Sequence, residues 1–272
     1  MFTLAKARLP NCSISSAGDA LRGFLLFRLY GVLASWGEIA VGERRGSWSR
    51  PSKSAVLGLV AAALGLKRQE NDRHAALAAG YGFAIRVDSP GVPLRDFHTV
   101  QTAHSRDVKM LRKRNARPLT RSCELSVKAC VTILSQRDYY ADALYTVALW
   151  PRDDAPMSLF KIRNALLRPE FTLYLGRKSC PLSLPLAPEV IKAGELLHAF
   201  AVYRPLESNE LSSPLSIILN QENMPTLFAW EDNIVPTACL RSIHVERRRD
   251  VPSDRLRWHF SERHEQVAIL RT

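Results

Sequence analysis

The sequence predicts an α+β protein whose elements follow the order β-α-β-β-α-β, the split β-α-β arrangement. Three observations favour it: short apolar runs typical of buried strands, segments with helical spacing between them, and a long basic insertion between the middle two strands. The chain has 272 residues and is 46% apolar, enough to bury one large core or two small ones. We expect residues 1–22, rich in Ser and Ala, to be a loose extension outside this fold.

A strand and two helices form the first half of the predicted unit. Residues 24–30 (FLLFRLY) are a strand-like apolar run. Ser52 follows a proline and is a plausible helix N-cap, because the next apolar residues recur with helical spacing up to Leu64. A second short helix is predicted over residues 72–79, ending at Gly80.

The second half supplies the remaining strands and the last helix. Strands are predicted over residues 81–88, 143–150 and 171–175, and a helix over residues 156–167. The resulting four-stranded sheet would be ferredoxin-like, and RNA-recognition domains use the same sheet. We therefore assign residues 23–188 to one domain.

After Pro188 the pattern weakens. Short strands are expected at residues 215–221, 226–230 and 238–246. These predict a smaller β-rich lobe over residues 189–272.

The net charge of +12 predicts attraction to a polyanion, either nucleic acid or an anionic membrane surface, although general solubility is the simpler alternative. No apolar run is long enough to span a membrane. Five cysteines without a C-x-x-C pair argue against zinc and against a disulfide framework, and favour a reducing cytoplasm. We expect no cofactor and no metal.

The basic insertion covers about residues 101–134. Between Arg95 and Arg137 there are ten Lys or Arg residues against three Asp or Glu residues. The segment shows no helical pattern, and loops of this length are usually functional or disordered. A solvated loop is the alternative, but we favour an arm that grips a nucleic-acid backbone. Its candidate contacts, with their flanking residues, are His98, Lys109, Arg112, Lys113, Arg114, Arg117 and Arg137.

A second basic segment, residues 43–54, leads into the first helix. Free N–H groups at a helix N-terminus bind anions, and cations here would add to that attraction. A tryptophan in this segment could stack on a base or could simply pack. The candidate contacts are Arg44, Arg45, Trp48, Arg50, Ser52 and Lys53.

A glycine turn follows residues 171–175. Gly176, Arg177 and Lys178 resemble the end of a nucleotide-binding loop, but the glycine five residues earlier is missing and the prolines that follow forbid a helix. These departures from the motif argue against an ATPase. The turn is either a plain surface turn or a place where backbone N–H groups and cations meet RNA phosphates.

Catalytic chemistry is weakly indicated. His98, Tyr139 and Tyr140 could cleave RNA by general acid–base catalysis, although their spacing does not require it. There is no G-x-S-x-G or H-E-x-x-H motif.

Several segments together resemble the CasD family, the fifth-numbered CRISPR-associated family, found in type I-E Cascade. The resemblance covers residues 24–186 and is carried by LLFRLYGVLASWGE, RPSKSAVLGLVAAALG, LRDFHTVQ, ADALYTVALW and FTLYLGRKSCPLSLPL. It implies a RAMP-superfamily core that is ferredoxin-like and bears a projecting β-hairpin thumb. The insertion over residues 101–134 matches the thumb position, and the Gly176 turn matches the glycine-rich loop of the superfamily.

The resemblance also implies a function. Such a subunit caps one end of the Cascade backbone, holds the 5′ handle of the CRISPR RNA (crRNA), and touches the neighbouring backbone subunit and the large PAM-reading subunit. In type I-E systems a separate endonuclease cuts the precursor, whereas a related family in type I-C does so itself. We therefore expect a non-catalytic RNA-binding subunit. The alternatives are an endoribonuclease that processes the repeat and, more weakly, contact with target DNA.

Overall fold

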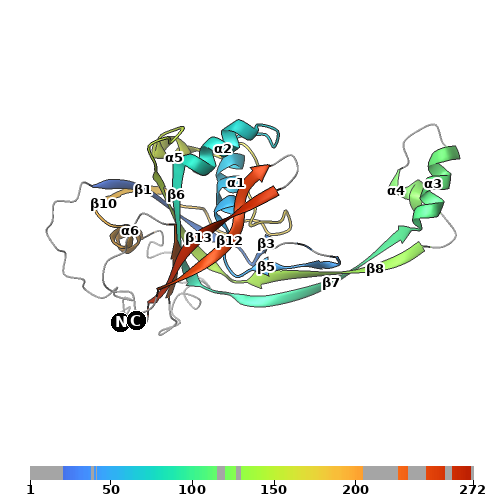
Figure 1. Cartoon of the computed structure of the whole chain (residues 1–272). Helices are drawn as coiled ribbons and strands as arrows, with labels where there is room; N and C mark the ends of the chain where they lie inside the picture. Colours follow the sequence, from blue (N-terminus) through green and yellow to red (C-terminus); the bar gives the residue numbers. More distant parts are fainter. Residues whose placement is uncertain are drawn as a thin grey trace.

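A seven-stranded antiparallel sheet organises the body of the protein (Figure 1). The computed structural model describes residues 21–37, 40, 42–114, 120–126, 130–204, 226–231, 243–254 and 259–270. In order across the sheet, the strands are β10 (Glu189–Ala193), β1 (Arg22–Tyr30), β9 (Leu144–Pro151), β6 (Tyr81–Ser89), β11 (Thr226–Trp230), β13 (His259–Leu270) and β12 (Ile243–Asp254). The predicted mixture of helices and a sheet is confirmed, and the structure shows that the sheet is antiparallel.

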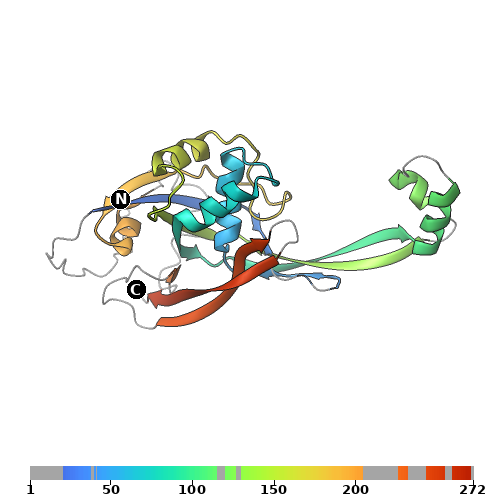
Figure 2. The same ribbon diagram turned by 45° about the horizontal axis from the view of Figure 1, so that its top comes forward.

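Helices cover both faces of this sheet. α1 (Lys53–Ala63), α2 (Asn71–Gly80) and α5 (Leu159–Leu167) lie on one face, and α6 (Leu196–Val202) lies on the other (Figures 1 and 2). Side chains of a strand alternate between its two faces. Phe27 therefore packs in the core beneath α1, α2 and α5, while Phe24 and Leu26 pack in the core beneath α6. Because both faces are covered, β1 is apolar from Phe24 to Tyr30 at every position except Arg28.

The start of α1 agrees with the sequence. The hydroxyl of Ser52 accepts a hydrogen bond from the backbone N–H of Ala55 at 3.2 Å. This confirms Ser52 as the N-cap.

A two-stranded arm projects from the body, and its far end carries two helices (Figures 1 and 2). β7 (Val92–Ala103) and β8 (Cys130–Ala141) pair along their full lengths. The helices at the tip are α3 (Ser105–Arg114) and α4 (Arg121–Leu125). The arm therefore begins earlier than predicted, and its tip is helical, contrary to our prediction. The helical spacing of Val108 and Leu111 on α3 was missed because charged residues surround it.

Four very short strands fix the base of the arm to the body. β2 (Leu33–Ala34) pairs antiparallel with β8, and β4 (Arg44–Arg45) pairs parallel with it. β3 (Trp36–Gly37) pairs with β5 (Ser47–Trp48). The segment between β1 and α1 thus holds the base of the arm against the body.

Two sequence predictions are corrected here. Residues 171–175 are not a strand: only Tyr174 bridges to Pro181, since the prolines that follow cannot sustain a ladder. β10 instead occupies the position beside β1. Nor do the described strands after residue 188 form a separate lobe, because β10, β11, β12 and β13 all belong to the main sheet.

The structure describes some of the remaining predicted segments and not others. The strand over residues 226–230 is confirmed as β11. Residues 1–20 and the predicted strand 215–221 lie outside the described residues, and Arg22 already begins β1. None of the described helices is long and apolar enough to cross a membrane.

Candidate nucleic-acid interface

Exposed cations gather where the arm leaves the body. Arg44 and Arg45 lie on β4 beside β8, where Arg45 is the register partner of Arg137. The carboxylate of Asp138 accepts hydrogen bonds from Arg44 at 3.2 Å and from Arg95, across the hairpin, at 2.7 Å. Bonding to Arg95 lowers the pKa of Asp138, against an opposing effect of burial, and Arg44 lowers it further. The carboxylate therefore stays ionised and orients two guanidinium groups at the surface.

The Gly176 turn packs against this base. Gly176 has φ +84°, and a Cβ there would lie 1.8 Å from the carbonyl oxygen of Ser35, so only glycine fits. The backbone N–H of Ser35 donates to the carbonyl of Leu175 at 3.1 Å. The structure therefore contains the predicted tight glycine turn. The sequence did not indicate that this turn lies beside residues 34–36.

The cations of the turn have different roles. Arg177 Nη2 donates to the carbonyl of Arg45 at 3.1 Å, and the Arg177 guanidinium lies 4.9 Å from the ring centre of Tyr139. Arg177 therefore braces the turn against the arm and is only partly exposed, whereas Lys178 is exposed. The fold thus brings residues 176–178 to Arg45, some 130 positions earlier in the chain.

A second group of cations lies at the tip of the arm. Lys109, Arg112, Lys113 and Arg114 are all exposed on α3. Only Arg112 among these four has an ion pair in the described part of the chain, with Glu124 of α4 at 3.3 Å. Arg117 lies outside the described residues. At ~3.3 Å per residue, the ladder from residue 96 to residue 103 separates the two groups by about 23 Å.

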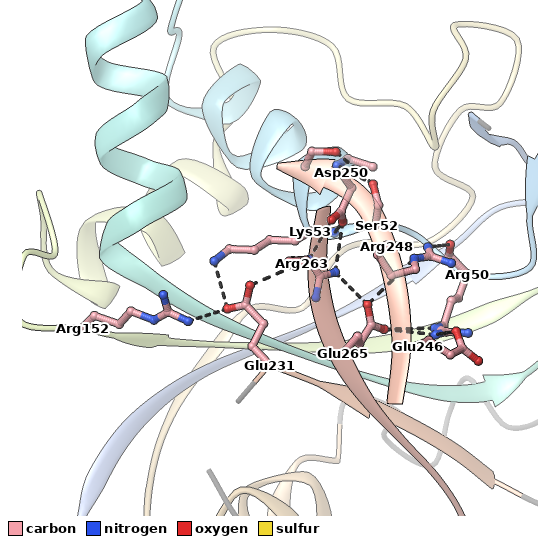
Figure 3. A network of polar contacts seen from close by, with 12 residues as sticks. Arg50, Ser52, Lys53, Arg152, Glu231, Glu246, Arg248, Asp250, Arg263 and Glu265 are labelled. Carbon is pink, nitrogen blue, oxygen red and sulfur yellow. Dashed lines mark hydrogen bonds and ion pairs between the residues drawn. The ribbon is translucent and has the colours of Figure 1, made fainter. Parts of the chain in front are cut away.

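The prediction for Arg50 and Lys53 is wrong. Both side chains are buried in a network of ion pairs that links α1 to β11, β12 and β13 (Figure 3). Arg50 pairs with Glu246 at 2.6 Å and Glu265 at 3.2 Å, while Lys53 pairs with Glu231 at 2.9 Å. These cations are not available to an RNA phosphate.

The N-terminus of α1 is also occupied. The backbone N–H of Lys53 donates to the carboxylate of Asp250 at 2.9 Å, and Ser52 fills the cap position. An internal carboxylate thus takes the place that we predicted for an RNA phosphate. Ser52 is a structural cap in this fold.

The sequence did not reveal the other members of this network. Arg263 pairs with Asp250 and with Glu265, both at 2.7 Å, and Arg152 pairs with Glu231 at 2.7 Å. Burial lowers the pKa of Lys53, and the nearby Glu231 opposes that shift. Charged residues alternate along the sequence of the last strands, and this pattern was the only sequence signal of the buried network. The same pattern is equally typical of a strand exposed to solvent.

The candidate catalytic residues do not converge. His98 Nδ1 lies 2.8 Å from the Asp96 carboxylate, and both side chains are partly exposed, at 41% and 44%. His98 is the register partner of Ser135, so Tyr139 lies four residues further along β8, about 13 Å away at ~3.3 Å per residue. Tyr139 is also buried, and Tyr140 points to the opposite face of the hairpin.

Comparison with known proteins places the chain in a family. The family model described as CRISPR-associated protein (Cas_Cas5) matches residues 24–265. The chain is 32% identical over 194 residues to the CRISPR system Cascade subunit CasD of Escherichia coli (strain K12), covering 68% of this chain and 79% of that protein. The chain belongs to the Cas5 (CasD) family of CRISPR-associated proteins. The family predicted from residues 24–186 is thereby confirmed, and the match extends well beyond them.

Solved structures agree with membership of the Cas5 (CasD) family. A chain of a CRISPR RNA-guided surveillance complex matches with a TM-score of 0.58 and 25% identity, over 92% of this chain and 90% of that one. A second match, a crystal structure of a Cas protein, has a TM-score of 0.50 and 25% identity, over 91% and 95% of the two chains.

Proposed function

We propose that this Cas5 (CasD) protein is a non-catalytic RNA-binding subunit of a type I-E Cascade complex in the cytoplasm. It holds the 5′ handle of the crRNA and caps one end of the backbone during defence against invading DNA. The observation that carries this proposal is the pair of cation groups at the base and tip of one projecting arm. The names of its relatives support it, since one is a Cascade subunit and another is a chain of an RNA-guided surveillance complex.

The core of the subunit is, we infer, a ferredoxin-like RAMP domain. The sheet order β10-β1-β9-β6, antiparallel throughout, is the one expected when β1, β6, β9 and β10 are the four strands of a split β-α-β unit. The arm β7–β8 is then the thumb, inserted between the second and third of these strands. β11, β13 and β12 extend the sheet beyond that unit.

The two cation groups suit an RNA backbone. Arg44, Arg45, Arg137 and Lys178 surround the base of the arm, and α3 presents cations about 23 Å further out, so one strand could be held at two places. Backbone contacts of this kind need no catalytic constellation, because base pairing between guide and target supplies the sequence specificity.

The arm also fits protein partners. Leu94, Val100, Val131 and Ile133 share one face of the hairpin by register, and each is 41–46% exposed. Exposed apolar residues on one face are typical of a surface that another protein covers. We assign such contacts to the neighbouring backbone subunit and the large PAM-reading subunit, with target DNA as a further contact.

Charge reversal on the arm tests the proposal. Lys109→Glu with Lys113→Glu should weaken binding of a crRNA that carries the repeat-derived handle, measured by fluorescence anisotropy across a salt series. The slope of log affinity against log salt should become shallower by ~0.7 for each phosphate that the variant no longer neutralises. The control Lys161→Glu with Lys192→Glu makes the same charge change on exposed residues of α5 and β10. Equal affinity of the two double variants would reject the proposal.

The exposed pair of His98 and Asp96 keeps a processing endoribonuclease as the second candidate. Purified protein incubated with unprocessed repeat RNA in EDTA should leave it intact. Cleavage at the handle boundary that is abolished in His98→Ala would establish the endoribonuclease instead.

A further inference from the structure

Trp48 differs from the other tryptophans of the described chain. Its side chain is 39% exposed, whereas Trp36, Trp150 and Trp230 are at most 6% exposed. It lies on β5, close in sequence to Arg44 and Arg45 at the base of the arm. A large aromatic ring is therefore open to solvent, three and four positions along the chain from two exposed arginines.

The indole of Trp48 rests on a buried guanidinium. Arg248 of β12 is 2% exposed, and its Cζ lies 4.3 Å from the centre of the Trp48 ring. Arg248 Nη2 in turn donates to the carbonyl of Arg50 at 3.4 Å, and Arg50 is held by Glu246 and Glu265 (Figure 3). The support of the ring is thus part of the buried ion-pair network.

The backbone around Trp48 is fixed as well. Trp48 is the register partner of Trp36, and the backbone N–H of Trp36 donates to the hydroxyl of Ser47 at 2.8 Å. A ring held on one side by Arg248 and along its backbone by β3 loses little conformational freedom when a ligand stacks on it. Such preorganisation raises affinity.

We propose that Trp48, backed by Arg248, is a stacking platform for one unpaired base of the bound RNA. The inference rests on the RNA-binding function proposed above and adds a subsite to it. Stacking of a base on an aromatic side chain contributes about 1–3 kcal/mol and tolerates any base. Arg44 and Arg45 would hold the flanking phosphates while the ring holds the base. The competing explanation is that Trp48 only shields Arg248 from water.

Two substitutions separate these explanations. Trp48→Phe keeps an aromatic ring, whereas Trp48→Leu keeps an apolar cover without one. We expect Trp48→Leu to weaken single-stranded RNA binding about 5- to 150-fold, with an unchanged salt slope and melting temperature. Trp48→Phe should retain most of the affinity. Wild-type affinity in Trp48→Leu, or equal losses in both variants together with a lower melting temperature, would overturn the proposal.

A scan with abasic RNA identifies the stacked base. In one series of oligonucleotides each base is removed in turn while the phosphates remain. At one position, removal of the base should weaken RNA binding by the wild-type protein. The same removal should not further weaken RNA binding by Trp48→Leu, which is the coupling expected of a direct contact. Equal sensitivity of both proteins at every position would reject the stacking platform.

Tryptophan fluorescence gives an independent readout. Trp258 lies outside the described residues, so the measurement uses a Trp258→Phe background. Acrylamide should quench Trp48 in the free protein, and bound RNA should protect it. If bound RNA leaves the acrylamide quenching of Trp48 unchanged, the proposal is contradicted.

The arm variants keep the two hypotheses distinguishable. If Lys109→Glu with Lys113→Glu weakens RNA binding but Trp48→Leu does not, the stacking platform fails and the RNA-binding function stands. If the arm variant binds as tightly as its control, the proposed function itself fails.

Discussion

Arg50 and Glu265 form an ion pair at 3.2 Å although 215 positions separate them in the sequence, and their side chains are only 5% and 1% exposed. Glu265 also accepts a hydrogen bond from Arg263 at 2.7 Å. Arg248 lies 3.9 Å from the same carboxylate. One buried carboxylate therefore faces three guanidinium groups and joins the segment before α1 to β12 and β13.

Replacing this carboxylate should destabilise the fold strongly. Among the described residues, Glu265→Gln leaves the buried guanidinium of Arg248 without an ion-pair partner and removes one of the carboxylates that hold Arg50 and Arg263. We therefore expect the free energy of unfolding to fall by about 3–5 kcal/mol in urea denaturation. The control is Glu262→Gln, because Glu262 is 59% exposed and lies 3.9 Å from an exposed Arg247. That change should cost no more than about 1 kcal/mol. Similar losses in both variants would show that the network contributes nothing specific.

The turn at Gly176 should tolerate no side chain. Gly176→Ala places a Cβ at positive φ, which costs about 1–3 kcal/mol, and against the Ser35 carbonyl as well. Gly58→Ala is the control, since Gly58 lies within α1 with open space around it and should gain about 0.5–1 kcal/mol. The unfolding temperature should therefore fall in Gly176→Ala and rise in Gly58→Ala. A neutral Gly176→Ala would contradict the contact with Ser35.

Acid should weaken the base of the arm. The pKa of Asp138 is lowered in the folded protein, chiefly by its bond to Arg95, so its stabilising contribution is complete above the unfolded pKa of about 3.9. That contribution is lost as the pH falls through the folded pKa. Asp138→Asn should be less stable than the wild type at neutral pH and should lose less stability on acidification. Parallel pH profiles for the two proteins would show that the pKa of Asp138 is not lowered.

Removing the tip should separate folding from binding. None of the described residues of α3 or α4 is buried, and Ala103 pairs with Cys130 at the end of the ladder. An Asn-Gly turn that joins these two residues can close the hairpin. The shortened protein should unfold at the wild-type temperature, bind crRNA more weakly and show a shallower salt slope. A lower unfolding temperature would mean that the tip contributes to the body.

Patterns local in sequence were predicted well. Ser52 as an N-cap and residues 226–230 as a strand depend on neighbouring residues alone, and the structure confirms both. The combination of a sheet with helices was also predictable, because β1 and β9 are mostly apolar runs of strand length. Residues 171–175 misled us because they have a strand-like composition but no partner strand.

Contacts between distant segments could not be predicted. Arg50 and Lys53 look like exposed cations, since their partners Glu246, Glu265 and Glu231 come about 180–215 positions later. β13 was missed for the same reason, because its charged residues read as solvent-facing. Arg45, Gly176 and Arg177 were each proposed as contacts, but only the fold shows that they meet. Whether these residues touch RNA stays a prediction.

Because β11 pairs with β6, the edge of β6 stays uncovered until β11 has been translated. At about 5–20 residues per second, β6 waits on the order of ten seconds before β11 is translated and can cover its edge. During that interval its unpaired N–H and C=O groups invite association with other chains. β12, one edge strand of the finished sheet, carries exposed charges at Arg247 and Arg249 and a proline at position 252, which discourage such association. Protection against aggregation therefore arrives late, when the C-terminal strands join the sheet.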